Sequence, residues 1–98
     1  MALIDQYNFE LLKNEAEKLV FDELERQLAA FEGDMCRCND CVADMAAMAL
    51  NMVKPLYRFS LLGTLYAAQA MADEAYAASV REAVSMAIEK IRLNPSHD

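Results

Sequence analysis

The sequence contains little glycine, little proline and no tryptophan. Among its 98 residues there are 2 Gly and 2 Pro, the residues that most often interrupt helices and form turns. Much of its 56% hydrophobic content is alanine and methionine, which favour helices over strands. The composition therefore predicts a mainly α fold. A chain of this length has room for one domain, so we expect residues 1–98 to form a single domain.

Positive charge is also scarce. Nine Lys and Arg residues face 16 Asp and Glu residues, which gives a formal net charge of -7. Nucleic acids and anionic membrane surfaces are bound largely through cationic side chains. We therefore expect no direct nucleic-acid binding and no membrane partner.

Long hydrophobic runs are missing as well. Residues 1–6, Met-Ala-Leu-Ile-Asp-Gln, lack the basic and apolar regions of a signal peptide, and no apolar run approaches the ~20 residues that span a bilayer. We expect a cytoplasmic protein. Thiols stay reduced in that compartment, and three cysteines cannot all pair within one chain. The cysteines therefore indicate a metal or redox role rather than a disulfide framework.

The first part of the chain has the period of an amphipathic helix. The pattern predicts a helix from about Asp5 to Phe31, closed by Gly33 in a left-handed conformation. A polar loop, residues 32–39, follows and carries Cys36 and Cys38. The apolar positions of the predicted helix are Phe9, Leu12, Ala16, Leu19, Val20, Leu24, Leu28 and Phe31.

A second helix is predicted from Asn39 or Asp40, either of which can cap it. We expect it to end near Lys54, because Pro55 disfavours the helical conformation in the residue before it. Its apolar positions share one face, as in a helix that packs on a core. These are Val42, Met45, Ala46, Ala49, Leu50 and Val53.

The last third of the chain predicts an extended segment and one more helix. Apolar and polar residues alternate loosely over residues 56–61, and a break is predicted after them at 63–64. This pattern indicates one short strand. Helical period returns from about Gln69 to Leu93, where the Asn94-Pro95 pair is expected to stop the helix, and residues 94–98 are expected to form a flexible tail. The apolar positions of this helix are Tyr76, Val80, Val84, Ala87, Ile88 and Ile91. The predicted fold is thus a small domain of three to four helices, with a cysteine loop between the first two long helices and a short extended segment before the last.

Three cysteines fall within six residues, at Cys36, Cys38 and Cys41. Thiolates that converge on one point repel each other unless a cation lies between them, and zinc prefers such ligands. We expect about one zinc ion per chain, which would join the end of the first helix to the start of the second. Two alternatives stay open: a redox-reactive thiol cluster that forms reversible disulfides, and ordinary loop cysteines.

A closed structural zinc site normally has four protein ligands, and the chain has no fourth cysteine. His97, the one histidine, is the predicted fourth ligand. The alternatives are a water, a residue from a second subunit, or a carboxylate of Asp34, Asp40 or Asp44.

Several short motifs occur in a characteristic order. Asn14-Glu15 and Leu19-Val20 precede Cys36-x-Cys38-x-x-Cys41, which is followed by Asp44 and then by Ala49-Leu50-Asn51-x-x-x-Pro55-x-Tyr57. This order resembles the late competence development protein ComFB family. The resemblance implies a bacterial homodimer that acts in signalling through an unidentified protein partner, has no known enzymatic activity and holds zinc with its cysteines. The chain departs from the family at Leu56, where a proline is frequent, and in lacking the fourth cysteine of some members.

Some relatives in this family are receptors for cyclic dinucleotides, so the resemblance implies an alternative function as a receptor for cyclic di-GMP or cyclic di-AMP. Aromatic and guanidinium planes would contact the bases, and cationic side chains the phosphates. The structural alternative is that Asn51 caps a helix, while Tyr57 and Tyr66 pack against the last helix. The predicted ligand-binding residues are Asn51, Lys54, Tyr57, Arg58, Tyr66 and Arg81.

Catalysis would need a nucleophile beside a base, or a metal with an open position and a polarised water. The three cysteines resemble part of a zinc deaminase site, but no H-x-E or C-x-E motif precedes a P-C-x-x-C here. We therefore expect a protein that is not an enzyme.

Overall fold

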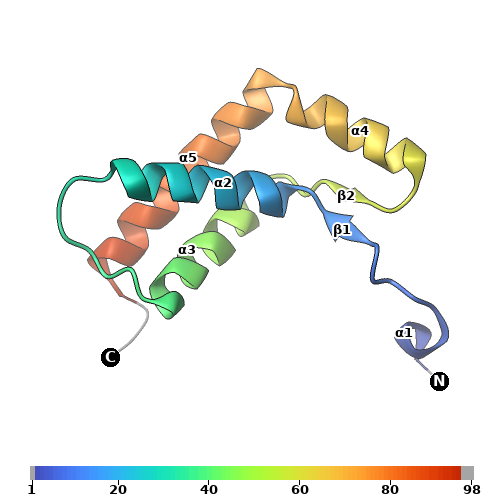
Figure 1. Ribbon diagram of the computed structural model, residues 1–98, viewed down its shortest axis with the longest axis horizontal. Coiled ribbons are helices and arrows are strands. Elements are labelled where there is room, and N and C mark those ends of the chain that lie inside the picture. The colour runs from blue at the N-terminus through green and yellow to red at the C-terminus, as the bar shows by residue number, and fades with distance from the viewer. Residues whose placement is uncertain (1, 96–98) are drawn as a thin grey trace.

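The computed structural model describes residues 2–95, so Met1 and residues 96–98, with His97 and most of the expected tail, lie outside the described part. Five helices and two short strands follow each other along these residues (Figure 1). The mainly helical class and the position of the cysteine loop between two long helices are confirmed. The elements are α1 (Leu3–Gln6), β1 (Lys13–Asn14), α2 (Ala16–Ala30), α3 (Asn39–Met52), β2 (Tyr57–Arg58), α4 (Leu61–Met71) and α5 (Glu74–Leu93).

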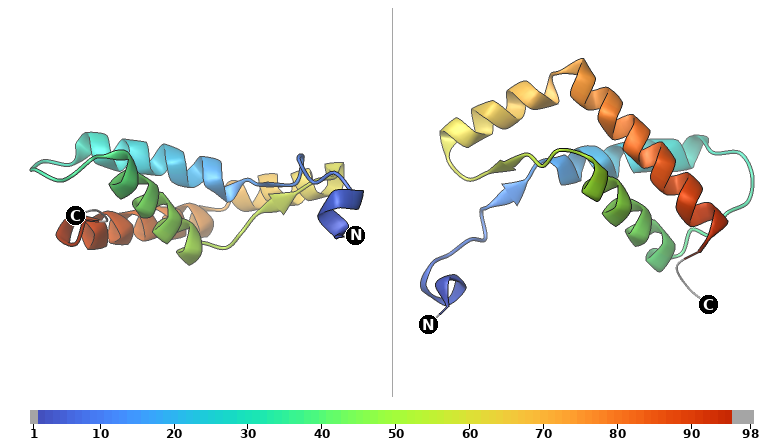
Figure 2. Two further views of the ribbon diagram at one scale, coloured as in Figure 1. Left: turned by 90° about the horizontal axis from the view of Figure 1, so that it is seen from below. Right: turned by 180° about the vertical axis from the view of Figure 1, so that it is seen from behind.

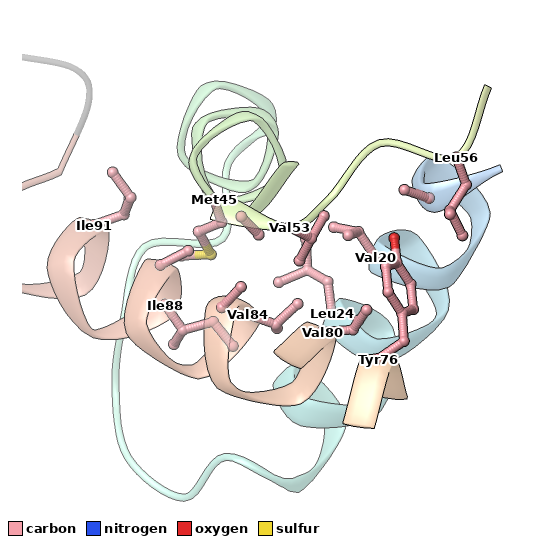
Figure 3. Packing of buried hydrophobic residues seen from close by; sticks show 14 of the residues in the cluster. Val20, Leu24, Met45, Val53, Leu56, Tyr76, Val80, Val84, Ile88 and Ile91 are labelled. Atoms are coloured by element: carbon pink, nitrogen blue, oxygen red, sulfur yellow. The ribbon is translucent and has the colours of Figure 1, made fainter. Parts of the chain in front are cut away.

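Helices α2, α3 and α5 contact one another and enclose the core. The apolar faces that the helical period predicted supply the buried side chains, among them Val20, Leu24, Met45 and Val84 (Figure 3). The molecule is flat, with extents of 46 × 37 × 17 Å, and α4 and the N-terminal residues extend beyond the three packed helices (Figures 1 and 2). Along residues 2–95, no helix is both long and apolar enough to cross a membrane.

The first long helix begins at Ala16, and the prediction of a start near Asp5 was wrong. Instead β1 pairs antiparallel with β2, and α1 has no buried residue. Phe9 and Leu12 fit the helical period, but they are 41% and 44% exposed and do not belong to the core. Long-range strand pairing therefore overrides the local period. The helix ends at Ala30, and Gly33, with φ of 122°, turns the loop beyond it.

The start of α3 agrees with the prediction, but its cap does not. The Sγ atom of Cys38 accepts a hydrogen bond from the backbone N–H of Cys41 at 3.4 Å, so Cys38 rather than Asn39 or Asp40 occupies the N-cap position. A thiol sulfur is a weak hydrogen-bond acceptor, so a cap by the carboxamide of Asn39 or the carboxylate of Asp40 was expected instead.

The short strand predicted after Pro55 is confirmed as β2, but the predicted break at 63–64 was wrong. Both residues lie inside α4, whose N-cap Ser60 accepts a hydrogen bond from the N–H of Gly63. The last helix starts at Glu74 rather than near Gln69, because Asp73 caps α5 by accepting from the N–H of Ala75. It ends at Leu93, as the Asn94-Pro95 pair predicted.

One junction connects the N-terminal segment to the core. The Oδ1 atom of Asn14 accepts hydrogen bonds from the N–H of Ala16 at 3.1 Å and from the N–H of Leu56 at 2.8 Å. The carboxylate of Glu15 pairs with the guanidinium of Arg58. These contacts hold β2 against the start of α2.

Tyr76 attaches the segment between α3 and β2 to α5. Its hydroxyl donates to the carbonyl of Lys54 at 2.7 Å, and burial raises the pKa of Tyr76 above its usual value. The hydroxyl therefore stays protonated and remains a donor at neutral pH.

Candidate metal centre

The three cysteines come together where the loop after α2 enters α3. Cys41 lies in the first turn of α3 and is fully buried, Cys36 is half-buried and Cys38 is exposed. Their sulfur atoms all lie within 4.8 Å of one another. The site therefore joins a buried core position to the surface.

Local structure holds the loop in place. The guanidinium of Arg37 donates a hydrogen bond from Nη1 to the carbonyl of Leu28 at 2.7 Å, which fastens the loop to the last turn of α2. Met35 and Cys36 pack against the core. The backbone N–H groups and dipole at the start of α3 favour negative charge on a thiolate there, and Arg37 adds a positive charge nearby.

This geometry fits a tetrahedral zinc site. Zn–S bonds of ~2.3 Å place the sulfurs of a zinc site ~3.8 Å apart. Sulfurs that already lie within 4.8 Å of one another reach that spacing by small side-chain movements. The arrangement supplies three soft ligands for one cation.

The fourth ligand stays a prediction. The group of potential ligands among residues 2–95 contains the three cysteines and none of Asp34, Asp40 or Asp44. His97, the predicted fourth ligand, lies outside the described residues.

The residues predicted to bind a cyclic dinucleotide are spread over several elements. Arg58 lines a hollow of about 380 Å³ beside Glu15 and α4. Arg81 lines a different hollow of about 270 Å³ between α2 and α5, and its guanidinium donates to Glu74 at 2.6 Å. The two guanidinium groups therefore line separate hollows, and each already pairs with a carboxylate.

The remaining predicted residues lie on the surface. Asn51 is in the last turn of α3 and Lys54 follows that helix; both are exposed. Tyr57 and Tyr66 are 61% and 65% exposed, so most of each side chain is not covered by the last helix.

The sequence did not predict a groove between α2 and α3. This groove, of about 610 Å³, adjoins the cysteine loop and has mainly apolar walls. Phe21 lines it and lies off the apolar face of α2, at 49% exposure, which is the one local signal that could have indicated the groove. Its lining includes Leu24, Leu28, Val42, Arg37 and Asn39.

Comparisons with known proteins found a matching family and a solved structure with a similar fold. The family of the late competence development protein ComFB matches residues 13–95. The solved structure of the late competence protein ComFB from Bacillus subtilis resembles this fold with a TM-score of 0.69 and 22% sequence identity, over 87% of this chain and 92% of that one. Among curated proteins, none matches the chain. The matched range contains all three cysteines and every element from β1 to α5.

Proposed function

This chain belongs to the late competence development protein ComFB family, and from that premise we propose that it is a non-catalytic regulatory module. It works as a homodimer in which each copy holds a structural zinc ion with Cys36, Cys38 and Cys41. The observation that carries the zinc assignment is the convergence of three sulfurs within 4.8 Å of one another.

Zinc at this position would stabilise the fold directly. Cys41 belongs to the core and Cys36 packs against it, whereas Arg37 ties the same loop to α2. An ion bound by all three sulfurs therefore fixes the loop between α2 and α3. Because its ligands are brought together only in the folded chain, metal binding contributes to the free energy of folding. The fourth ligand is His97, a water or a residue of another chain.

The metal content of untagged protein purified without chelator tests this assignment. We expect about one zinc per chain by elemental mass spectrometry. Cys38→Ser, which changes an exposed cysteine, should remove most of the zinc. Asp34→Asn, in the same loop but outside the ligand group, should retain it. Equal zinc contents in the two variants would contradict the assignment.

The same preparations separate zinc from the redox alternative and identify the fourth ligand. His97→Ala should lower zinc affinity if the imidazole coordinates the ion, and should leave it unchanged if water does. In zinc-loaded protein, coordination should protect the thiols from a mild oxidant. Rapid, reversible disulfide formation in protein as purified, without zinc, would instead favour a thiol redox sensor.

Receptor function for cyclic di-GMP or cyclic di-AMP remains a prediction from the family resemblance. A phosphate at Arg58 or Arg81 would have to compete with the carboxylate already paired with each guanidinium. A ligand that binds the folded state raises its melting temperature. No rise with saturating cyclic di-GMP or cyclic di-AMP would exclude the receptor function for these two nucleotides.

A further inference from the structure

Helix α4 is mainly apolar and leaves most of its surface uncovered. Its sequence, LLGTLYAAQAM, contains no charged residue, and only Ala67 is buried within this chain. Leu62, Leu65 and Tyr66, which share one face, are 61%, 56% and 65% exposed. A helix with so much apolar surface is normally buried. Helix α4 therefore requires a cover beyond its own chain.

A second apolar segment lies at the same end of the molecule. The N-terminal arm, defined as residues 2–12, contains α1, of which no residue is buried. Leu3, Ile4, Tyr7 and Leu11 are between 61% and 73% exposed. Figure 1 shows the arm and α4 on opposite sides of the β1–β2 sheet, both beyond the three packed helices. Both segments therefore leave apolar side chains uncovered at this end of the molecule.

The exposed apolar area of α4, the arm and the β2 segment between them exceeds what a stable interface needs. With about 200 Å² for each fully exposed large side chain, the large apolar side chains of these segments expose roughly 1,500 Å² in total. A stable interface buries about 800 Å² per partner, and the largest apolar patch of a typical monomer is ~300–600 Å². These side chains are Leu3, Ile4, Tyr7, Phe9, Leu11, Leu12, Tyr57, Phe59, Leu61, Leu62, Leu65 and Tyr66.

At α4, charge does not oppose a second copy of this chain as the partner. With a net charge of -7, two copies repel each other over most of their surfaces, but α4 carries no charge. A two-fold axis also places the same patch on both sides of the contact, so an apolar patch is complementary to itself. We propose that α4 and the N-terminal arm form the interface of the homodimer. This inference rests on the proposed homodimer and names the segments that form its interface.

Sedimentation equilibrium of full-length variants tests the position. Leu65→Lys places a charge in the α4 part of the interface once from each copy, and we expect the dimer dissociation constant to rise at least ~100-fold. Leu93→Lys is the matched control, because Leu93 is 68% exposed at the far end of α5 and undergoes the same change in charge. We expect its dissociation constant to stay within ~3-fold of the wild type. Ile4→Lys, in the arm, should raise it ~10-fold.

The outcomes separate this inference from the proposed function. A wild-type protein that is monomeric at all concentrations refutes the homodimer, and the interface with it. A wild-type dimer that Leu65→Lys leaves intact overturns the assigned position, while the homodimer stands. An unchanged constant for Ile4→Lys overturns the role of the arm. Circular dichroism and zinc content report whether each variant folds, and Leu65→Ser, with a ~10-fold rise expected, replaces the lysine variant if that protein is unfolded.

Discussion

Replacing Asn14 with alanine removes one side-chain acceptor that serves two backbone donors. Oδ1 of Asn14 accepts from the N–H of Ala16, at the start of α2, and from the N–H of Leu56, at the entrance to β2. Both hydrogen bonds are partly buried, and the second joins residues 42 positions apart. The substitution should therefore loosen the N-terminus of α2 and the attachment of β2 together.

The magnitude follows from the cost of two partly buried donors that lose their acceptor. Each contributes about 1–1.5 kcal/mol, so Asn14→Ala should lower the free energy of unfolding by ~2–3 kcal/mol. For a domain of this size that corresponds to a fall in melting temperature of ~10–20 °C. Asn14→Asp keeps an acceptor at the same position and should lose less than ~1 kcal/mol.

Urea unfolding followed by far-ultraviolet circular dichroism measures these differences. Zinc should be in excess and the protein concentration fixed, because ligand binding and dimerisation both shift apparent stability. The matched control is Asn8→Ala, since Oδ1 of Asn8 accepts only a local, exposed hydrogen bond from the N–H of Glu10 at 2.8 Å. Its expected loss is below ~0.5 kcal/mol. Equal losses for Asn14→Ala and Asn8→Ala would refute the reasoning.

Substitutions at three further positions test the core and its ionic surroundings. Tyr76→Phe removes the donor to the Lys54 carbonyl and should lower the unfolding free energy by about 1 kcal/mol, measured by urea unfolding. Met45→Ala opens a cavity at a fully buried position and should lose ~2–5 kcal/mol, whereas Met45→Leu should lose less than ~1.5 kcal/mol; similar losses would contradict close packing there. Hydrogen bonding from Arg26 lowers the pKa of the Glu23 carboxyl in the folded protein. The ionised carboxylate therefore stabilises the fold at a pH above its unfolded pKa of ~4.3. This contribution disappears as the pH falls through the pKa of the folded state. The stability difference between wild type and Glu23→Gln should therefore shrink from about pH 6 to about pH 3, and a constant difference would exclude this role.

Much of the helical interior could be predicted from the sequence because a helix places residues of one spacing on one face. Val20 and Leu24 of α2 and Val84 and Ile88 of α5 were predicted by this period and are buried. The zinc candidates were found for a similar reason. Cys36, Cys38 and Cys41 lie within six residues, so their spacing alone brings the sulfurs near one another.

The ends of the helices were harder to predict, because distant contacts decide them. Phe9 and Leu12 continue the period of α2, yet the chain before Ala16 is diverted by pairing with residues more than forty positions away. Propensity also led to the wrong prediction of a break at 63–64, where α4 lies, since Gly63 is a poor helix former but its N–H is the group that Ser60 caps.

The sequence by itself determined the helical class, the apolar faces of the long helices and the grouping of the cysteines, because each depends on residues near one another along the chain. Tertiary structure decided which apolar residues the core covers. It buries Val84 completely but leaves Leu65 and Ile4 more than half exposed, although all three are equally apolar in the sequence. It also placed Arg58 and Arg81 in separate hollows, each beside a carboxylate. Burial and pairing depend on how helices pack in three dimensions, which local spacing does not specify.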